Sequence, residues 1–325
     1  MRKILINLSL NKKQKHLLEA QAPQAAFIYR EPGRAKKDDV LAADIIIGNV
    51  SPALLAGANR LEWLQLQSAG TDGYVEALSG TGTILTNASG AYGLAISEHM
   101  MGMALCLMKN LHRYIINQQQ HVWKDEGPVT SLYGATVLIV GLGDIGGEFA
   151  KRCKAMGGTT LGIRRVLRPK PEEIDELYGL DQLNDVLPKA DIVALSLPGT
   201  KETYHLFDAD RLSKMKKGAI LLNVGRGTAI DQNALADALE NGHLGGAGLD
   251  VTDPEPLPKE NRLWKAPNLL LTPHVSGGYH LRETKERIIR LSAMNLKHFL
   301  DGQPMDSVVD FTTGYRSVAQ LNFNS

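Results

Sequence analysis

Three segments in the second half of the chain supply an arginine, a glutamate and a histidine, a set that could bind an acid and transfer a proton. They are Asn-Val-Gly-Arg-Gly at 223–227, Asp-Val-Thr-Asp-Pro-Glu-Pro at 250–256 and Leu-Thr-Pro-His-Val-Ser-Gly at 271–277. Each lies where a strand is expected to end, and ligands of open α/β sheets bind beyond the carboxyl ends of strands. We therefore expect Arg226, Glu255 and His274 to face one ligand.

The three side chains form a chemically coherent set, whereas each alone is ambiguous. Arginine binds carboxylates through paired hydrogen bonds, and histidine changes its charge near neutral pH. Considered alone, His274 after a proline could be a hydrogen-bonded loop histidine, and Glu255 between two prolines could be an ordinary surface acid. Their joint occurrence favours a functional site.

A glycine-rich turn opens the same half of the chain. The β-branched run Thr136–Val140 leads into Gly-Leu-Gly-Asp-Ile-Gly and then into a helix-compatible segment. In a dinucleotide-binding turn the first glycine allows the tight bend, the second admits the pyrophosphate and the third lets helix and strand pack closely. The amides at the helix start then face a negative charge. The residues expected to contact the dinucleotide here are Gly141, Gly143, Asp144, Ile145 and Gly146.

The cofactor preference is indicated by the end of the next strand. An NAD enzyme usually carries Asp or Glu there for the ribose 2′-hydroxyl. This chain instead has Arg164 and Arg165, followed by Arg168. Two guanidinium groups suit a 2′-phosphate, so NADP is predicted as the preferred cofactor. The alternative is two solvated arginines beside NAD.

Strand-like and helix-like segments alternate along most of the chain, which predicts parallel sheets. In the first part the expected strands are 4–8, 25–29, 43–48, 63–67 and 83–86, and the expected helices are 12–22, 52–56 and 74–78. In the second part the expected strands are 136–140, 159–163, 191–197, 220–224, 247–251 and 269–271, and the expected helices are 145–156, 209–215 and 232–242. A final helix is expected at 280–300.

Between the two parts, apolar residues at three- and four-residue steps predict one long helix over about 91–117. It contains four methionines (100, 101, 103 and 108), which we interpret as core or interface packing because Met fills irregular apolar gaps. A helix in this position suits a connection between domains or a dimer surface.

Composition bounds the class of protein. The 325 residues suffice for two domains, and a net charge of +1 gives no electrostatic reason to expect a nucleic-acid or membrane partner. Cys106 and Cys153 lack zinc-site spacing and are expected to be buried free thiols. The segment 4–10 is interpreted as a strand rather than a signal peptide. No apolar run is long enough for a membrane span, and the cytoplasm is the expected location.

The four motifs, in this order, resemble those of the D-isomer-specific 2-hydroxyacid dehydrogenase family: the glycine fingerprint, N-x-G-R-G, D-V-x-x-x-E-P and T-P-H-x-(S/A)-G, which here span 141–277. The resemblance implies an α/β protein with two doubly wound parallel-sheet domains. A Rossmann dinucleotide-binding domain at 98–294 would be inserted in a discontinuous, flavodoxin-like substrate domain at 1–97 and 295–325. It further implies an NAD(P)-dependent oxidoreductase that acts on the CH–OH group of a small 2-hydroxy acid, or reduces the 2-keto acid, as a homodimer.

The resemblance also assigns roles to residues. His274 would be the general acid, Glu255 its carboxylate partner, and Arg226 the group that binds the substrate carboxylate. In the first domain Ser68, Ala69 and Gly70 resemble a substrate loop whose Ala69 and Gly70 N–H groups take the carboxylate; a simple turn is the alternative. Further residues expected at the cofactor are Leu197, Pro198, Thr203, Val224, Gly225, Arg226, Asp250, His274 and Gly277.

Two other functions remain open on the same scaffold. Formate dehydrogenases of this family replace the glutamate with glutamine, and Glu255 argues against that activity. Some relatives are dinucleotide-sensing corepressors that retain the Arg, Glu and His, and the near-neutral charge and the lack of disordered extensions make this reading weaker. The substrate stays open among glyoxylate or hydroxypyruvate, phosphoglycerate, and branched or aromatic keto acids.

Overall fold

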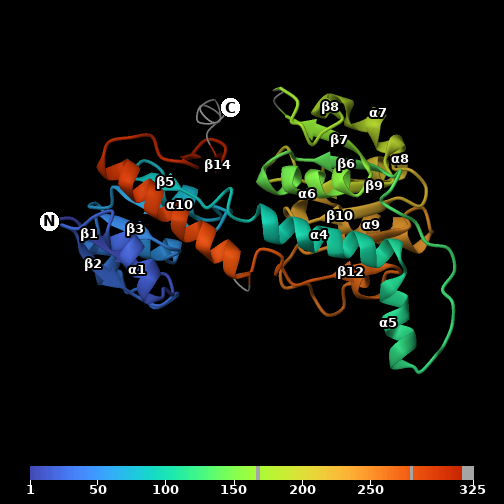
Figure 1. Cartoon of the computed structure of the whole chain (residues 1–325), viewed down its shortest axis with the longest axis horizontal. Helices are drawn as coiled ribbons and strands as arrows, with labels where there is room; N and C mark the ends of the chain where they lie inside the picture. The colour runs from blue at the N-terminus through green and yellow to red at the C-terminus, as the bar shows by residue number, and fades with distance from the viewer. Residues whose placement is uncertain (166–168, 279–280, 317–325) are drawn as a thin grey trace. The chain divides into compact units, whose positions relative to one another are not determined.

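The computed structural model describes residues 1–165, 169–278 and 281–316, and its chain divides into two compact units (Figure 1). The first unit comprises Met1–Tyr92 and Tyr279–Ser325, and the second comprises Gly93–Gly278. These limits differ from the expected domain boundaries at 97 and 294. The difference is larger at the second boundary, because helix α10 (Arg282–Leu300) packs its buried Ala293 and Leu296 against the core of the first unit. The sequence showed the helix but not which core it joins.

The first unit is built on a five-stranded sheet of order β2-β1-β3-β4-β5, in which all paired strands are parallel. This is the flavodoxin-like order, so the expected fold of this unit is confirmed. Its strands are β1 (Lys3–Ile6), β2 (Ala26–Tyr29), β3 (Ile45–Ile47), β4 (Trp63–Gln65) and β5 (Ile84–Thr86). Its other helices are α1 (Lys12–Glu19), α2 (Lys37–Ala42), the 3₁₀ turn η1 (Pro52–Leu55) and α3 (Tyr74–Leu78), and the short strands β13 (Val309–Asp310) and β14 (Tyr315–Arg316) follow α10.

The second unit contains a seven-stranded parallel sheet of order β12-β11-β10-β9-β6-β7-β8. The chain order reverses between β6 and β9, which is the switch point where α/β sheets bind ligands. The strands are β6 (Thr136–Val140), β7 (Thr159–Arg164), β8 (Glu176–Gly179), β9 (Ile192–Leu195), β10 (Ile220–Asn223), β11 (Gly246–Leu249) and β12 (Leu269–Leu271). Besides the helices over residues 93–119, which are described below, the unit contains α6 (Asp144–Ala155), α7 (Leu183–Val186), α8 (Ala209–Lys214) and α9 (Gln232–Glu240), with 3₁₀ turns η2 (Leu180–Gln182), η3 (Leu187–Lys189), η4 (Gly227–Ala229) and η5 (Arg262–Lys265). The doubly wound Rossmann expectation is confirmed, although the short edge strand β8 was not predicted.

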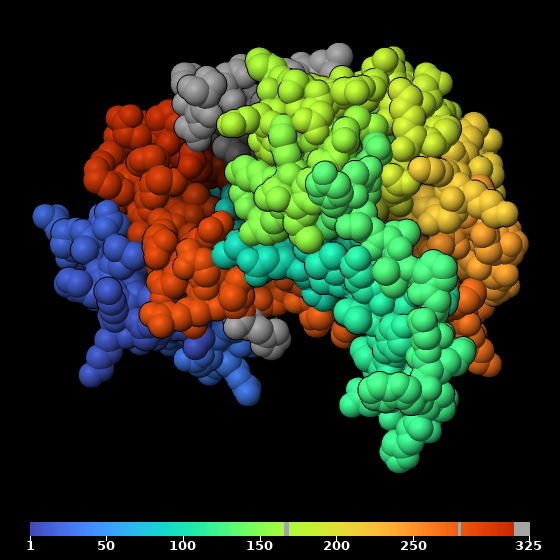
Figure 2. All heavy atoms as spheres, turned by 45° about the vertical axis from the view of Figure 1, so that its right-hand side comes forward, coloured from blue at the N-terminus to red at the C-terminus, as the bar shows by residue number. Residues whose placement is uncertain are grey.

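The single long helix predicted over 91–117 is wrong, because the structure has two helices, α4 (Gly93–Met108) and α5 (Leu111–Gln119). Asn110 separates them with a left-handed backbone (φ 54°), which asparagine adopts more readily than most residues. The methionines of α4 are buried, as predicted. Helix α5 has no buried residue and projects from the body of its unit (Figures 1 and 2). None of the described helices is long and apolar enough to cross a membrane.

Candidate active site

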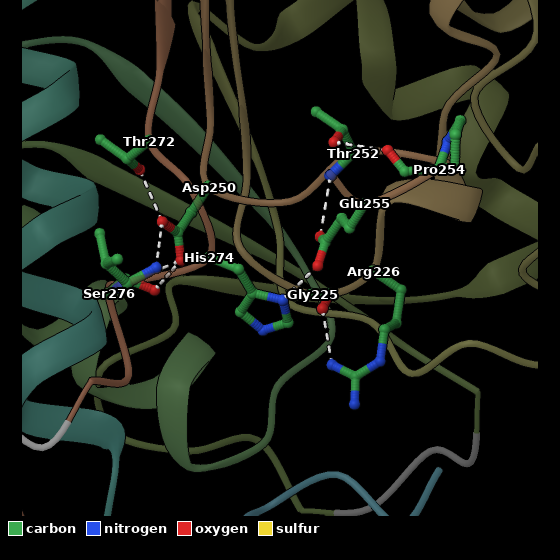
Figure 3. A network of polar contacts seen from close by, with 10 residues as sticks. Gly225, Arg226, Asp250, Thr252, Pro254, Glu255, Thr272, His274 and Ser276 are labelled. Atoms are coloured by element: carbon green, nitrogen blue, oxygen red, sulfur yellow. Dashed lines mark hydrogen bonds and ion pairs between the residues drawn. The ribbon is translucent and has the colours of Figure 1, made fainter. Parts of the chain in front are cut away.

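Three neighbouring strands of the second unit deliver Arg226, Glu255 and His274. Arg226 follows β10, Glu255 follows β11 and His274 follows β12, and these strands are adjacent in the sheet. Because all three run parallel, their carboxyl ends lie at the same sheet edge. The structure therefore brings the three segments together as expected (Figure 3).

The imidazole of His274 is paired with the carboxylate of Glu255. Its Nδ1 lies 2.8 Å from Glu255 Oε2, and the other carboxylate oxygen, Oε1, accepts a 3.1 Å hydrogen bond from the Thr252 N–H. Both side chains are partly exposed, at 47% for His274 and 38% for Glu255. Glu255 is thus oriented by its own turn, and the Nε2 of His274 remains on the far side of the ring from its partner.

The loop that carries His274 is tied to a buried carboxylate, Asp250. Asp250 Oδ1 accepts hydrogen bonds from the Thr272 hydroxyl (2.6 Å) and the Val275 N–H (2.9 Å), while Oδ2 accepts from the N–H (3.0 Å) and the hydroxyl of Ser276 (Figure 3). The His274 N–H donates to the carbonyl of Asp250 at 2.7 Å. Four donors on one side chain fix the loop, so Asp250 supports His274 in addition to any contact with a cofactor.

A further histidine, His99, contacts this network through Thr272. The Nε2 of His99, on α4, lies 3.0 Å from the Thr272 hydroxyl oxygen. Because that hydroxyl donates to Asp250, its lone pairs can accept from the imidazole. Sequence reasoning missed His99, Thr272 and Ser276 as supports, because their roles depend on contacts between segments far apart in the chain.

The turn that carries Arg226 is shaped by the buried side chain of Asn223. Its Oδ1 accepts from the Gly225 N–H at 3.0 Å, and its Nδ2 donates to the Arg226 carbonyl at 2.9 Å. Arg226 Nη1 donates to the Gly225 carbonyl at 2.8 Å. A Cβ at position 225 would lie 2.4 Å from the carbonyl oxygen of Leu197, so the turn packs closely on the end of β9. The asparagine of the motif therefore positions the arginine.

The glycine-rich turn has the geometry that a dinucleotide phosphate requires. Gly141 has φ +101°, and a Cβ at position 146 would lie 2.1 Å from the Gly141 carbonyl oxygen. In contrast, a Cβ on Gly143 would meet no atom of the described chain within 4 Å. Helix α6 begins at the next residue, Asp144, with no side-chain N-cap hydrogen bond. The turn is thus closed where the helix packs on the strand and open where a phosphate would approach. Its residues therefore fit the pyrophosphate of a dinucleotide.

The other predicted cofactor residues occupy several environments. The Asp144 carboxylate accepts from the Gly93 N–H at 2.7 Å, so it joins the starts of α4 and α6. Thr203 is buried, and its hydroxyl donates to the Pro198 carbonyl at 2.6 Å. That hydroxyl closes the loop after β9. Val224 is buried, and Gly277 follows Ser276 in the His274 loop.

Arg164 and Arg165 lie at the end of β7, the strand next to β6. Arg164 is half-buried and its Nη2 donates to the carbonyl of Leu142 in the glycine-rich turn at 3.2 Å, whereas Arg165 is exposed. The pKa of Glu202 is lowered, chiefly by hydrogen bonds within its own loop, and the positive charge of Arg165 lowers it further. Both guanidinium groups are thus carried at the strand end where a ribose is bound in Rossmann folds. Arg168 lies outside the described residues.

In the first unit, Ser68, Ala69 and Gly70 form a loop directly after β4. The Ser68 hydroxyl donates to the Gly70 carbonyl at 2.8 Å and accepts from the Nδ2 of Asn49 at 3.0 Å. Asn49 Oδ1 also accepts from the Gln67 N–H at 2.9 Å. The loop is therefore a fixed structure at the carboxyl end of its sheet and not a loose turn.

Residues 101–276 match the family model for the NAD-binding domain of D-isomer specific 2-hydroxyacid dehydrogenases. The chain belongs to this family. The match covers more than half of the chain and contains the glycine-rich turn together with Arg226, Glu255 and His274, which confirms the family expected from the sequence motifs. A nicotinamide dinucleotide is accordingly its cofactor class.

Similar proteins extend the likeness over both units. The chain is 30% identical to a glyoxylate reductase of Korarchaeum cryptofilum over 93% of this chain and 92% of the relative. A D-isomer-specific 2-hydroxyacid dehydrogenase family structure from Aeromonas salmonicida has a TM-score of 0.83 at 37% identity, covering 95% of this chain and 99% of that one. An NADPH-dependent glyoxylate/hydroxypyruvate reductase from Sinorhizobium meliloti, solved with NADP and sulfate, has a TM-score of 0.82 at 25% identity, covering 97% and 100%.

Proposed function

We propose that this dehydrogenase interconverts a small 2-keto acid and the corresponding 2-hydroxy acid, with NADPH as the preferred reductant and glyoxylate or hydroxypyruvate as the first substrates to test. The observation that carries the proposal is the His274–Glu255 pair at 2.8 Å on the sheet edge that also carries Arg226. Relatives named as glyoxylate reductases support the substrate class. Phosphoglycerate and larger keto acids stay as alternatives.

His274 would deliver the proton. With Nδ1 engaged by Glu255, the protonated ring has its second N–H at Nε2, on the opposite side. A bound nicotinamide would supply the hydride for the carbonyl carbon, and His274 would hold the Nε2 proton where the carbonyl oxygen can take it. Glu255 stabilises the charged imidazolium before the transfer and keeps the ring in one orientation afterwards.

Each unit carries one group that could bind a substrate carboxylate: Arg226 in the second unit, and the main-chain amides of the Ser68–Gly70 loop in the first. A guanidinium binds a carboxylate through two parallel hydrogen bonds and favours the negative charge that develops on the carbonyl oxygen. The loop contributes N–H groups without a side chain in the way, since residues 69 and 70 are alanine and glycine. Both contacts select an acid over a neutral ketone.

NADPH preference rests on the β7 end. Arg164 is already held against the glycine-rich turn through Leu142, and Arg165 is exposed beside it. Two cations favour a 2′-phosphate, while neither can replace the carboxylate that accepts hydrogen bonds from the two ribose hydroxyls of NAD. The NADP-bound structure of the Sinorhizobium meliloti relative agrees with this preference.

A homodimer is proposed from helix α5 and the segment after it. Their exposed apolar side chains are Leu111, Ile115, Ile116, Val122, Trp123 and Val129, which are 44% to 104% exposed. A projecting arm with this much apolar surface fits a second copy of the chain, because large exposed apolar patches mark interaction sites. Light scattering after size-exclusion chromatography would give twice the chain mass, and Ile116→Asp would lower it. The cytoplasmic location remains a prediction.

The decisive experiment is a panel of 2-keto acids assayed with NADPH and NADH while the nicotinamide absorbance is followed. The proposal expects turnover of glyoxylate or hydroxypyruvate with higher kcat/KM for NADPH. Tight dinucleotide binding without turnover of any keto acid would instead favour a dinucleotide-sensing protein.

A further inference from the structure

The loop after β4 is held by its carbonyl groups. The carbonyl of Gln67 accepts from the Tyr92 hydroxyl, that of Ser68 from the Ala88 N–H at 2.9 Å, and that of Ala69 from the Asn87 Nδ2 at 2.7 Å. The Gly70 carbonyl accepts from the Ser68 hydroxyl. Four successive carbonyls are therefore engaged, three of them by the segment that follows β5, the strand next to β4.

The direction of the N–H groups follows from this anchoring. A trans peptide is planar, and its C=O and N–H bonds point in opposite directions. Fixing the Ala69 carbonyl on Asn87 turns the Gly70 N–H away from Asn87, and fixing the Ser68 carbonyl turns the Ala69 N–H away from Ala88. Successive N–H groups held in this way form a concave anion site.

These amides have no acceptor within the part of the chain that the structure describes. No residue of 1–165, 169–278 or 281–316 accepts a hydrogen bond from the N–H of Ala69 or Gly70. Both residues are half-buried, so their N–H groups need either solvent or a ligand as a partner. An anion supplies that partner better than a neutral group does.

Asn87 is built into the unit as a fixed donor. Its side chain is fully buried directly after β5, and its Oδ1 accepts from the Ser89 N–H at 3.1 Å. Its own N–H donates to the Ser307 carbonyl at 3.1 Å. The contact at Oδ1 holds the side-chain amide in the orientation in which its Nδ2 donates to the Ala69 carbonyl.

We propose that Asn87 is a positioning residue for the substrate carboxylate: its Nδ2 holds the Ala69–Gly70 peptide in the orientation that presents the Gly70 N–H to the carboxylate. This inference rests on the proposed function, in which the same loop binds a 2-keto acid. It adds a residue that touches neither substrate nor cofactor and acts through a single peptide group.

The sharpest variant is Asn87→Asp, because the shape is kept while the amide donor is replaced by a carboxylate oxygen. A carboxylate still accepts from the Ser89 N–H, but its second oxygen repels the Ala69 carbonyl instead of binding it. Without this hydrogen bond, Asn87 no longer holds the Ala69–Gly70 peptide with the Gly70 N–H turned away from it. Should Asn87→Asp fail to fold, Asn87→Ser removes the same donor without adding a charge.

A matched control is Asn295→Asp. Asn295 is equally buried in the same unit, and its Nδ2 donates to Gln65 Oε1 at 2.8 Å and to the Asp306 carbonyl at 3.0 Å. It has the same type of buried amide but does not contact the loop at 68–70. Any effect of general destabilisation should therefore appear in both variants.

The experiment measures kcat and KM for reduction of a keto acid, and the Kd of the dinucleotide. It also follows the amide NMR signal of Gly70 during titration with oxamate, a non-reacting substrate analogue. For Asn87→Asp we expect a KM raised at least about tenfold, the loss expected for a hydrogen bond to a charged group, with an unchanged dinucleotide Kd and a lost oxamate response at Gly70. Asn295→Asp should keep the wild-type KM and response.

An unchanged KM in folded Asn87→Asp, or equal KM increases in both variants, would overturn the inference. The inference would also be overturned if the Gly70 amide signal of the wild-type protein did not respond to oxamate. Absence of keto-acid turnover in the wild-type protein, with a Gly70 signal that still responds to oxamate and loses this response in Asn87→Asp, would refute the proposed function alone.

Discussion

The Nδ1 of His274 lies 2.8 Å from the Oε2 of Glu255, and the Oε1 of the same carboxylate is held by the Thr252 N–H. A histidine paired in this way has one nitrogen committed to orientation and one available for proton transfer. We predict that Glu255→Gln lowers kcat about 10²- to 10⁴-fold, the range of general acid–base contributions. An amide keeps the shape but does not stabilise the imidazolium. Steady-state kinetics would show this, and a kcat within a factor of two of the wild-type value would remove Glu255 from proton transfer.

Replacing Arg164 with Asp and Arg165 with Ala should reverse or level the cofactor preference. The new carboxylate can accept from ribose hydroxyls, and both cations that favour a 2′-phosphate are gone. The ratio of kcat/KM for NADPH to that for NADH measures the change. The control is Lys154→Ala. This variant also removes a positive charge, but Lys154 lies on α6 and pairs with Asp175, not at the end of β7. Equal use of both cofactors by the wild-type protein would contradict the prediction.

Thr272→Val should weaken both the fold of the second unit and the reaction. The variant keeps the side-chain volume but removes a hydroxyl that donates to the buried Asp250 and lies 3.0 Å from His99 Nε2. Losing a hydrogen bond to a charged group costs about 1.5–3 kcal/mol. We expect the free energy of unfolding in urea to fall by about that amount and kcat to fall because the His274 loop is less well held. A kcat loss without any stability loss would show that Asp250 does not act as the anchor of the loop.

The two cysteines should differ in reactivity. Burial raises the pKa of the Cys153 thiol to about 12, and burial also raises the pKa of Cys106, which is only partly covered. Since the thiolate is the reactive form, a raised pKa leaves both thiols protonated and slow at pH 8, and Cys153 the slower. Mass spectrometry after iodoacetamide treatment should find Cys106 alkylated first and Cys153 modified only on unfolding. Faster labelling of Cys153 in the folded protein would contradict its burial.

The grouping of the three candidate catalytic residues could be predicted from the sequence because it depends on strand ends. Arg226, Glu255 and His274 each follow a recognisable apolar run, and parallel strands place such positions at one edge. The supports could not be predicted in the same way. Thr272 and Asn87 act on partners in other segments, and neither has a local pattern that distinguishes it from an ordinary polar residue.

The differences between the expected and the observed fold have similar physical causes. The break at Asn110 depends on one left-handed residue inside a continuous helical pattern. The apolar face expected in the helix at 280–300 does not indicate which core it covers, and the unit limit after Gly278 therefore differs from the expected boundary at 294. Helical periodicity identifies which face is buried but carries no information about the partner.

The most direct test of the central claim is reduction of a 2-keto acid by His274→Ala, with dinucleotide binding measured in parallel by fluorescence. The imidazole is exposed and its loop is held through Asp250, so the variant should fold and bind the dinucleotide as the wild-type protein does. We predict that keto-acid reduction is nearly abolished while the dinucleotide Kd is unchanged. Turnover retained at the wild-type rate would contradict the assignment of His274 as the proton donor.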